Sequence, residues 1–174
     1  MIAIESSSRD MVEKLYQKYS DMVFRVGVLY MRNEQESYDI VQDVFLKLLC
    51  HPKQFEDEEQ EKAWILRVAI NRCKDQLKSF WRKKRISWQE YQNGSANGGE
   101  GIGYSDDFSD ERQMVMSAVQ NLPDIYKEVI YLFYYEGYKA EEIARLMRRN
   151  PSTVRSRLQK ARELLKKSLK GDLL

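Results

Sequence analysis

Apolar residues recur at steps of three and four positions along most of this chain, and the alternation typical of strands is nearly absent. In the first half, this spacing predicts helices over residues 9–31, 34–50 and 61–84, with Pro52 ending the second. The buried stripe of the first helix is expected to consist of Val12, Leu15, Tyr16, Tyr19, Val23, Val26 and Tyr30. The pattern therefore predicts an all-α chain.

The helical pattern stops at residues 93–107, a segment that holds five of the eight glycines and has almost nothing to bury. Helical spacing returns over residues 109–121, breaks at Leu122 and Pro123, and continues to Gly137, which is expected to end the helix. We therefore expect an all-α fold of two small helical domains joined by a flexible linker, with the bounds 1–88, 89–108 and 109–174.

The second domain contains a helix-turn-helix pattern: a short helix over residues 140–147, a few turn residues, and a longer helix that starts near residue 150. Asn150 is placed to cap the longer helix, and Pro151 suits its first position, where the missing N–H costs nothing. A helical wheel puts Val154, Leu158, Ala161 and Leu165 on one face, which is expected to pack on Ile143, Ala144 and Met147.

The opposite face of the longer helix is polar and basic, although the net charge of the whole chain is only +2. It carries Arg155, Ser156, Gln159 and Lys160, with Thr153 on the same surface. Arg pairs bidentately with guanine and Gln with adenine, while Ser donates to base edges or phosphate. Arg157 and Arg162, on the flanks, are expected to contact phosphates. The pattern predicts a DNA-reading helix, the other interpretation being the solvated surface of an ordinary helix pair.

Charge is distributed unevenly along the chain. Residues 1–60 carry 7 basic and 12 acidic side chains and residues 93–137 carry 2 and 8, whereas residues 61–92 carry 9 and 3 and residues 138–174 carry 11 and 4. Two basic blocks separated by an acidic one are typical of a protein that contacts a polyanion at two places, although solvated helices also carry patches of charge.

Composition disfavours several classes of protein. There is no run of about eighteen apolar residues, and the start is acidic and polar, so we expect a cytoplasmic protein without membrane insertion. With two cysteines, Cys50 and Cys73, and a single histidine, His51, no metal site, disulfide framework or cofactor is expected. A metal-dependent enzyme built on clustered carboxylates, at residues 39–43 or 56–61, is the weakest alternative.

Three longer motifs follow one another along the chain: YDIVQDVFLKLL at residues 38–49, AWILRVAINRCKDQLK at residues 63–78 and EEIARLMRRNPSTVRSRLQKAREL at residues 141–164. Together they resemble the sigma-70 family of bacterial RNA polymerase sigma factors, in its two-domain extracytoplasmic-function (ECF) class. The first resembles the helix that docks on the clamp of core polymerase. The second resembles the helix that binds and melts the near promoter element, and the third resembles the helix-turn-helix that reads the distant element.

The resemblance implies that polymerase docking falls on Asp39, Gln42 and Asp43, which share one helix face. The residues expected to turn inward from that helix are Val41, Val44, Phe45 and Leu48. A solvated helix face is the alternative interpretation of these three polar residues.

For the near element, the resemblance implies that Asn71 lines the pocket for a base extruded from the duplex. The residues expected to follow the DNA backbone or to stack on bases are Trp64, Arg67, Lys74, Lys78 and Arg82. Core packing is the other interpretation of Trp64, and Trp81 is a second candidate for stacking.

The sequence departs from the family pattern at two places. The loop where base choice is expected holds Phe55, Glu56 and Asp57, whereas relatives often have Phe-Arg-Gly. In the helix-turn-helix, Arg148 stands where glycine is common, so we expect Asn150 to supply the left-handed residue of the turn.

The resemblance thus implies a promoter-specificity subunit that is not an enzyme, with core RNA polymerase, promoter DNA and an anti-sigma factor as partners. A stand-alone helix-turn-helix regulator is the alternative. Such a regulator would need dimer symmetry to span two half-sites, and the sequence shows one such motif and no evident dimerisation helix.

Overall fold

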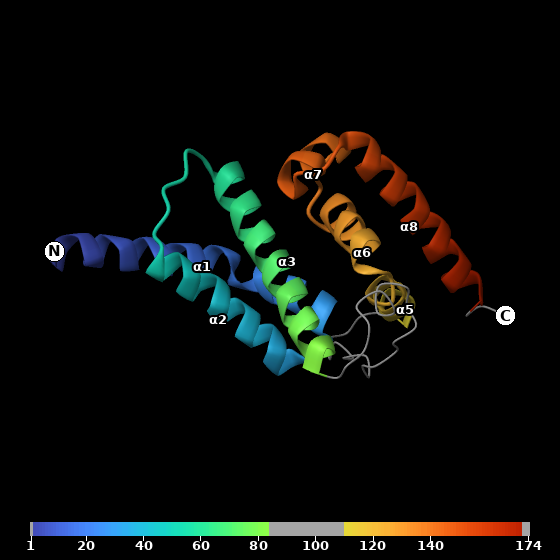
Figure 1. Cartoon of the computed structure of the whole chain (residues 1–174), viewed down its shortest axis with the longest axis horizontal. Helices are drawn as coiled ribbons and strands as arrows, with labels where there is room; N and C mark the ends of the chain where they lie inside the picture. Colours follow the sequence, from blue (N-terminus) through green and yellow to red (C-terminus); the bar gives the residue numbers. More distant parts are fainter. Residues whose placement is uncertain (1, 84–109, 172–174) are drawn as a thin grey trace. The chain divides into compact units, whose positions relative to one another are not determined.

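The computed structural model describes residues 2–83 and 110–171, and this part of the chain contains helices and no strand (Figure 1). The helices are α1 (Ile2–Met31), α2 (Glu34–Cys50), α3 (Glu58–Lys83), α5 (Asp110–Gln120), α6 (Asp124–Ile130), the π-helical turn η1 (Tyr131–Tyr135), α7 (Ala140–Met147) and α8 (Pro151–Gly171). The all-α prediction is confirmed. The chain divides into two compact units, residues 1–77 and 78–174. The predicted linker, residues 89–108, lies outside the described residues.

Two helices start earlier than predicted. α1 starts at Ile2 instead of residue 9, and α3 starts at Glu58 instead of residue 61. For α3 the cause is a capping arrangement, in which the Gln60 N–H donates to Asp57 Oδ1 at 2.8 Å and the Glu56 N–H donates to Gln60 Oε1 at 3.0 Å. The sequence signal for this helix start is therefore an aspartate followed three residues later by a glutamine, which the prediction from spacing missed.

The first unit is built on the close packing of α1 against α2. A Cβ added at Gly27 would lie 2.9 Å from the Ser37 Cα, so only glycine permits this approach of the two backbones. Ser37 is fully buried, and its hydroxyl donates to the Asn33 carbonyl oxygen at 2.6 Å. The four α2 residues predicted to turn inward, Val41, Val44, Phe45 and Leu48, are buried. Within this first unit, the buried residues of α3 are Ile65, Leu66, Ala69, Ile70 and Cys73.

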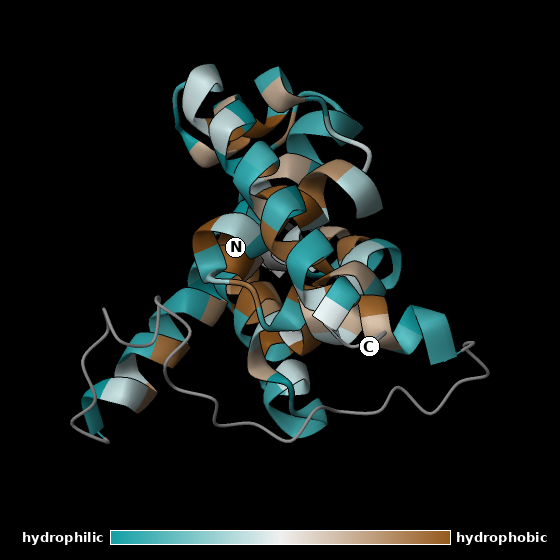
Figure 2. Cartoon of the chain, turned by 90° about the vertical axis from the view of Figure 1, so that its right-hand side faces the viewer, coloured by the Kyte–Doolittle hydropathy of each residue, from teal (hydrophilic) through white to brown (hydrophobic). Residues whose placement is uncertain are grey.

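Polar contacts at the surface join α3 to the other two helices of this unit. Lys18 Nζ on α1 lies 2.6 Å from Glu58 Oε1 and 2.9 Å from Glu61 Oε1, at the start of α3. Further along, Arg72 Nε donates to Asp43 Oδ2 on α2 at 2.7 Å. Figure 2 colours the ribbon by hydropathy and shows apolar and polar residues interspersed along the helices.

In the second unit, one face of α8 packs against α5, α6 and α7. Its inward residues Val154, Leu158 and Ala161 are buried as predicted, and so are Ile143 and Ala144 on α7. The prediction was less accurate at the edges of this core: Leu165 and Met147 are half-buried, and Leu146 is buried instead. Gly137 has φ +73°, which agrees with its predicted role as the stop after η1.

The turn between α7 and α8 corrects one expectation. Arg148 itself is left-handed, with φ 52° and ψ 50°, so Asn150 is not the residue that supplies this conformation. A left-handed non-glycine residue costs about 1–2 kcal/mol. The helix end offsets this cost because the Arg149 N–H donates to the Ala144 carbonyl at 2.9 Å and the Arg148 N–H donates to the Arg145 carbonyl at 3.3 Å.

Candidate nucleic-acid interface

The start of α8 is fixed as the sequence predicts. Pro151 is the first residue of the helix, and Asn150 Oδ1 accepts hydrogen bonds from the Ser152 N–H at 3.0 Å and from the Ser152 hydroxyl at 2.9 Å. The four residues predicted to face outward, Arg155, Ser156, Gln159 and Lys160, are all exposed, and Thr153 is half-buried beside them.

The outward side chains of α8 are held by neighbouring acceptors. Arg155 Nη2 lies 2.6 Å from Glu141 Oε1 on α7. The Ser156 hydroxyl donates to the Thr153 carbonyl at 3.0 Å. Glu163 accepts from the Gln159 amide at 3.4 Å and lies 3.6 Å from Lys160 Nζ. The outward face of α8 is thus a set of donors whose positions are already restrained by nearby acceptors.

The two flanking arginines of α8 have different surroundings. The Arg157 side chain is only 17% exposed, and its Nη1 lies 3.3 Å from Oε1 of Glu128, whose side chain is 2% exposed. Arg162 is exposed, and its Nε donates to the Tyr134 hydroxyl at 2.9 Å while its guanidinium lies 5.3 Å from the Phe133 ring centroid. Arg162 can therefore reach a phosphate, whereas Arg157 joins α8 to α6.

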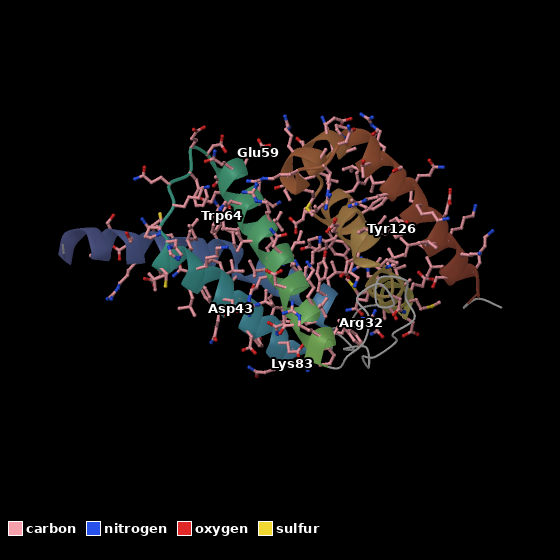
Figure 3. All side chains as sticks on the ribbon, in the orientation of Figure 1. Arg32, Asp43, Glu59, Trp64, Lys83 and Tyr126 are labelled. Carbon is pink, nitrogen blue, oxygen red and sulfur yellow. The ribbon has the colours of Figure 1, made fainter. Side chains whose placement is uncertain are left out.

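The residues predicted on α3 differ in exposure. Asn71, Lys78 and Arg82 are exposed, whereas Arg67 and Lys74 are half-buried. Lys83 lies at the end of this helix, and Trp64 lies in its first half (Figure 3).

The Trp64 side chain contacts the loop that precedes α3. Its half-buried ring lies 5.7 Å from the Phe55 ring centroid, and Lys53 Nζ lies 5.8 Å above it. Trp81 is 6% exposed, whereas its neighbour Phe80 is 40% exposed. Phe80 contacts Trp81 edge to face at 5.3 Å, and this aromatic pair, flanked by the basic residues Lys78, Arg82 and Lys83, could have singled it out in the sequence.

On α2, Asp39 and Gln42 are exposed, and Asp43 is partly occupied by Arg72. The sequence prediction missed two apolar residues on this face: Leu46 and Leu49 are 54% and 40% exposed. With Asp39 and Gln42 they continue at helical steps of three and four, so the same spacing rule could have found them.

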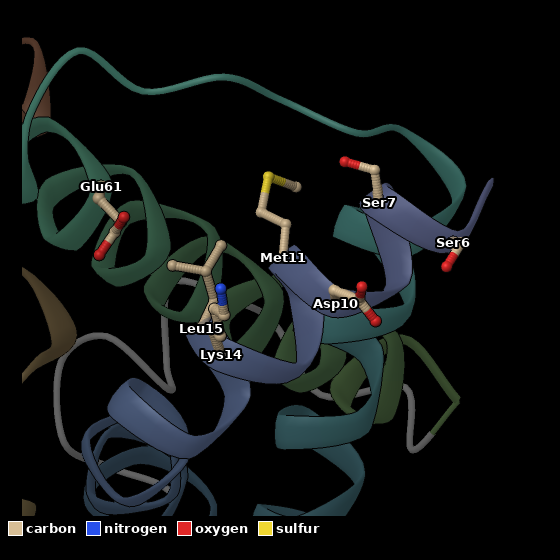
Figure 4. Close-up of a pocket in the computed structure, with 7 residues that line it drawn as sticks. All are labelled: Ser6, Ser7, Asp10, Met11, Lys14, Leu15 and Glu61. Atoms are coloured by element: carbon tan, nitrogen blue, oxygen red, sulfur yellow. The ribbon is translucent and has the colours of Figure 1, made fainter. Parts of the chain in front are cut away.

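Other kinds of site are not evident in the described residues. Within them, no group of three or more His, Cys, Asp and Glu side chains is arranged to hold a metal ion. No helix there is both long enough and apolar enough to cross a bilayer. Figure 4 shows an open hollow beside α1, lined by Ser6, Ser7, Asp10, Met11, Lys14, Leu15 and Glu61. The polar groups around it are mostly exposed, and it contains none of the predicted site residues.

Comparisons with known proteins agree with this arrangement. The family model for sigma-70 region 2 matches residues 15–83, and the model for sigma-70 region 4 matches residues 112–165. The RNA polymerase sigma factor SigV of Bacillus subtilis is 30% identical over 151 residues, which cover 86% of each protein. The chain belongs to the sigma-70 family. It is an ECF-type sigma factor, a non-catalytic polymerase subunit that directs promoter recognition and transcription initiation.

A further relative supports the assignment, and a solved structure shows the same fold. The RNA polymerase sigma-H factor of Pseudomonas aeruginosa is 27% identical over 174 residues, covering 95% of this chain and 90% of that protein. Among solved structures, the sigma factor RpoE of Bartonella quintana, in complex with the anti-sigma factor NepR, superposes with a TM-score of 0.72 at 20% identity, covering 91% of this chain and 96% of that one. Its likeness shows that the two share a fold.

Proposed function

We propose that α8 reads the distant promoter element through Arg155, Ser156, Gln159 and Lys160, with Thr153 at the edge of the contact. The observation that carries the proposal is the exposed row of donors on a helix whose opposite face is buried and whose start is capped. Such a helix presents the donor types that match guanine and adenine edges in the major groove.

In this proposal the two flanking arginines act differently. Arg162 contacts a phosphate, because its guanidinium is exposed and is held by aromatic side chains from η1. Arg157 holds α8 against α6 through Glu128 instead of touching DNA, because its side chain is mostly enclosed.

Melting of the near element is assigned to α3. Asn71 is exposed, and its amide offers both a donor and an acceptor to an extruded base. Lys78 and Arg82 follow the strand backbone, and Arg67 and Lys74 add positive charge along the same helix. Trp64 packs under the loop through Phe55, and Phe80 is the better candidate for stacking on an unpaired base.

Core polymerase docks on α2 in this proposal. Asp39 and Gln42 provide acceptors for basic groups of the partner, and Leu46 and Leu49 extend the contact with apolar area that is otherwise open to water. Asp43 contributes less to the partner because Arg72 already occupies part of its carboxylate.

We also propose that this protein works in the cytoplasm and that an anti-sigma factor controls it. The support for control by an anti-sigma factor is the likeness of its fold to RpoE of Bartonella quintana, whose structure was solved with the anti-sigma factor NepR. Co-purification of this chain with proteins from its own host would test the regulatory part.

One experiment tests the docking assignment. Asp39→Arg should weaken association with core polymerase by at least about tenfold and abolish promoter-directed transcription, because charge complementarity becomes repulsion. Glu13→Arg is the matched control, since Glu13 is an exposed carboxylate on α1. Undiminished association of Asp39→Arg with core polymerase would show that the docking surface lies elsewhere.

A further inference from the structure

Two successive glutamates open α7, and the structure gives them different partners. Glu142 Oε2 accepts a hydrogen bond from the Lys139 N–H at 2.7 Å, which satisfies a backbone donor at the helix start. Glu141 points elsewhere, and its Oε1 accepts from Arg155 Nη2 on α8 at 2.6 Å. The pair bridges the two helices of the helix-turn-helix, which are labelled α7 and α8 in Figure 1.

This ion pair is a weak source of stability. The two side chains are 59% and 57% exposed, and exposed pairs lose much of their attraction to water and salt. Its main consequence is geometric. An arginine side chain has several rotatable bonds, and a short contact to a carboxylate restricts them before any DNA arrives.

The guanidinium remains able to bind a base while it is held. Arginine has five N–H donors in a rigid fork, and the contact with Glu141 involves only one terminal nitrogen. The hydrogen bond from Arg155 lowers the pKa of the Glu141 carboxyl below its ordinary value, so the carboxylate is ionised at neutral pH. A negative charge is thereby placed beside the reading face, where it repels phosphate.

We propose that Glu141 is a positioning residue that sets the sequence specificity of Arg155. It holds the guanidinium in the orientation that matches a guanine edge and penalises DNA that lacks this guanine, because the carboxylate then faces the duplex with no compensating base contact. The inference rests on the proposed function of α8 as the reader of the distant element, and it adds a residue from the other helix of the motif.

The test uses the full-length chain with core polymerase. Binding-site selection with the wild-type chain first defines the distant element, and Arg155→Ala identifies the base pair that Arg155 reads. Dissociation constants are then measured for the selected promoter and for the same promoter with that base pair replaced. Their ratio is the discrimination at this position.

Glu141→Gln removes the charge and keeps the size of the side chain. We expect it to lower discrimination at the Arg155 position by about threefold to tenfold, which is a part of what one bidentate contact provides. We also expect it to raise affinity for the promoter with the replaced base pair by about twofold. In the Arg155→Ala background, Glu141→Gln should leave discrimination at this position unchanged. Loss of a merely structural contact would lower affinity for both promoters equally.

Glu111→Gln is the control for charge. It removes an exposed carboxylate on α5, outside the helix-turn-helix, so discrimination at the Arg155 position should not change. Circular dichroism confirms that each variant folds.

Three results would overturn the proposal. If the wild-type holoenzyme shows no base preference at the distant element, the assignment of α8 as reader fails, and the role of Glu141 fails with it. If Arg155→Ala abolishes discrimination but Glu141→Gln retains it in full, only the role of Glu141 is refuted. If Glu141→Gln changes preference at a different base pair, Glu141 is itself a reader and does not position Arg155.

Discussion

In the first unit, α3 is tied to its neighbours by ion pairs at the surface, whereas in the second unit α8 is tied to α6 by an ion pair that is largely buried. Arg72 and Asp43 are 40% and 37% exposed, whereas Arg157 and Glu128 are 17% and 2% exposed. An ion pair between an arginine and a carboxylate thus has different consequences in the two units. Water screens the attraction between Arg72 and Asp43. Glu128, in contrast, is poorly solvated, so the loss of Arg157 as a partner is costly.

The outward faces of the two helices differ in a related way. On α8, the donors Arg155, Gln159 and Lys160 are held by the carboxylates of Glu141 and Glu163. On α3, Asn71 is exposed on the outer surface of the helix. A restrained row of donors suits a regular duplex, whose groove has a fixed shape, while an exposed amide suits a single base that arrives only after the duplex opens.

The largest expected effect separates the two ion pairs. Arg157→Ala should lower the free energy of unfolding by about 2–4 kcal/mol, because it removes a cationic partner from the buried Glu128 carboxylate. Arg72→Ala, the matched change at the exposed pair, should lower it by no more than about 1 kcal/mol. Urea titration of the full-length chain, followed by circular dichroism, measures both. Equal losses for the two variants would remove the contrast between the units.

A second prediction concerns readout by α8. Arg155→Ala should cost about 1–3 kcal/mol of promoter binding and relax the preference at one base of the distant element, since a bidentate guanine contact is lost. Arg162→Ala should weaken binding to all sequences alike, because a phosphate contact carries no sequence information. Binding-site selection with the holoenzyme compares the two, and an unchanged base preference for Arg155→Ala would remove it from the reading face.

The role of α3 is tested by separating melting from binding. Asn71→Ala should leave closed-complex formation nearly intact and slow promoter opening by about tenfold, since the amide acts only on an extruded base. Permanganate reactivity of the opened thymines gives the measurement. Full reactivity at the wild-type rate would show that the base pocket lies elsewhere.

The smallest effect concerns the surface tie between α1 and α3. Hydrogen bonds to Glu58, and then to Glu61, raise the pKa of Lys18 above its ordinary value. A raised lysine pKa means that the stabilising contribution is fully present below the ordinary lysine pKa and is lost only as pH rises through the higher folded value. The melting temperature of Lys18→Met should therefore lie slightly below that of the wild type, by the same margin from about pH 6 to pH 9. A margin that shrinks across this range would contradict the assignment.

Much of the fold could be predicted from local sequence because helices depend on spacing and on end signals within a few residues. The inward residues Val154, Leu158 and Ala161 follow from a repeat of three and four. The start at Asn150 and Pro151 follows from capping chemistry, and the stop at Gly137 follows from the freedom of glycine at positive φ. The family follows from three motifs in order, as the matches to regions 2 and 4 confirm.

The tertiary structure decided what lies between residues that are distant in the sequence. Arg157 and Arg162 lie on opposite sides of the buried stripe on a helical wheel, which predicts the same exposure for both, and only the position of Glu128, 29 residues before Arg157, pairs one of them with a buried carboxylate. In the same way, Arg72 occupies Asp43 from another helix, and Glu141 reaches Arg155 across the turn. Even the left-handed residue, Arg148, follows from how α7 must end for α8 to pack on it. Ion pairs and turns of this kind depend on which helix faces pack against one another in space. Periodicity within a single helix contains no information about its neighbour.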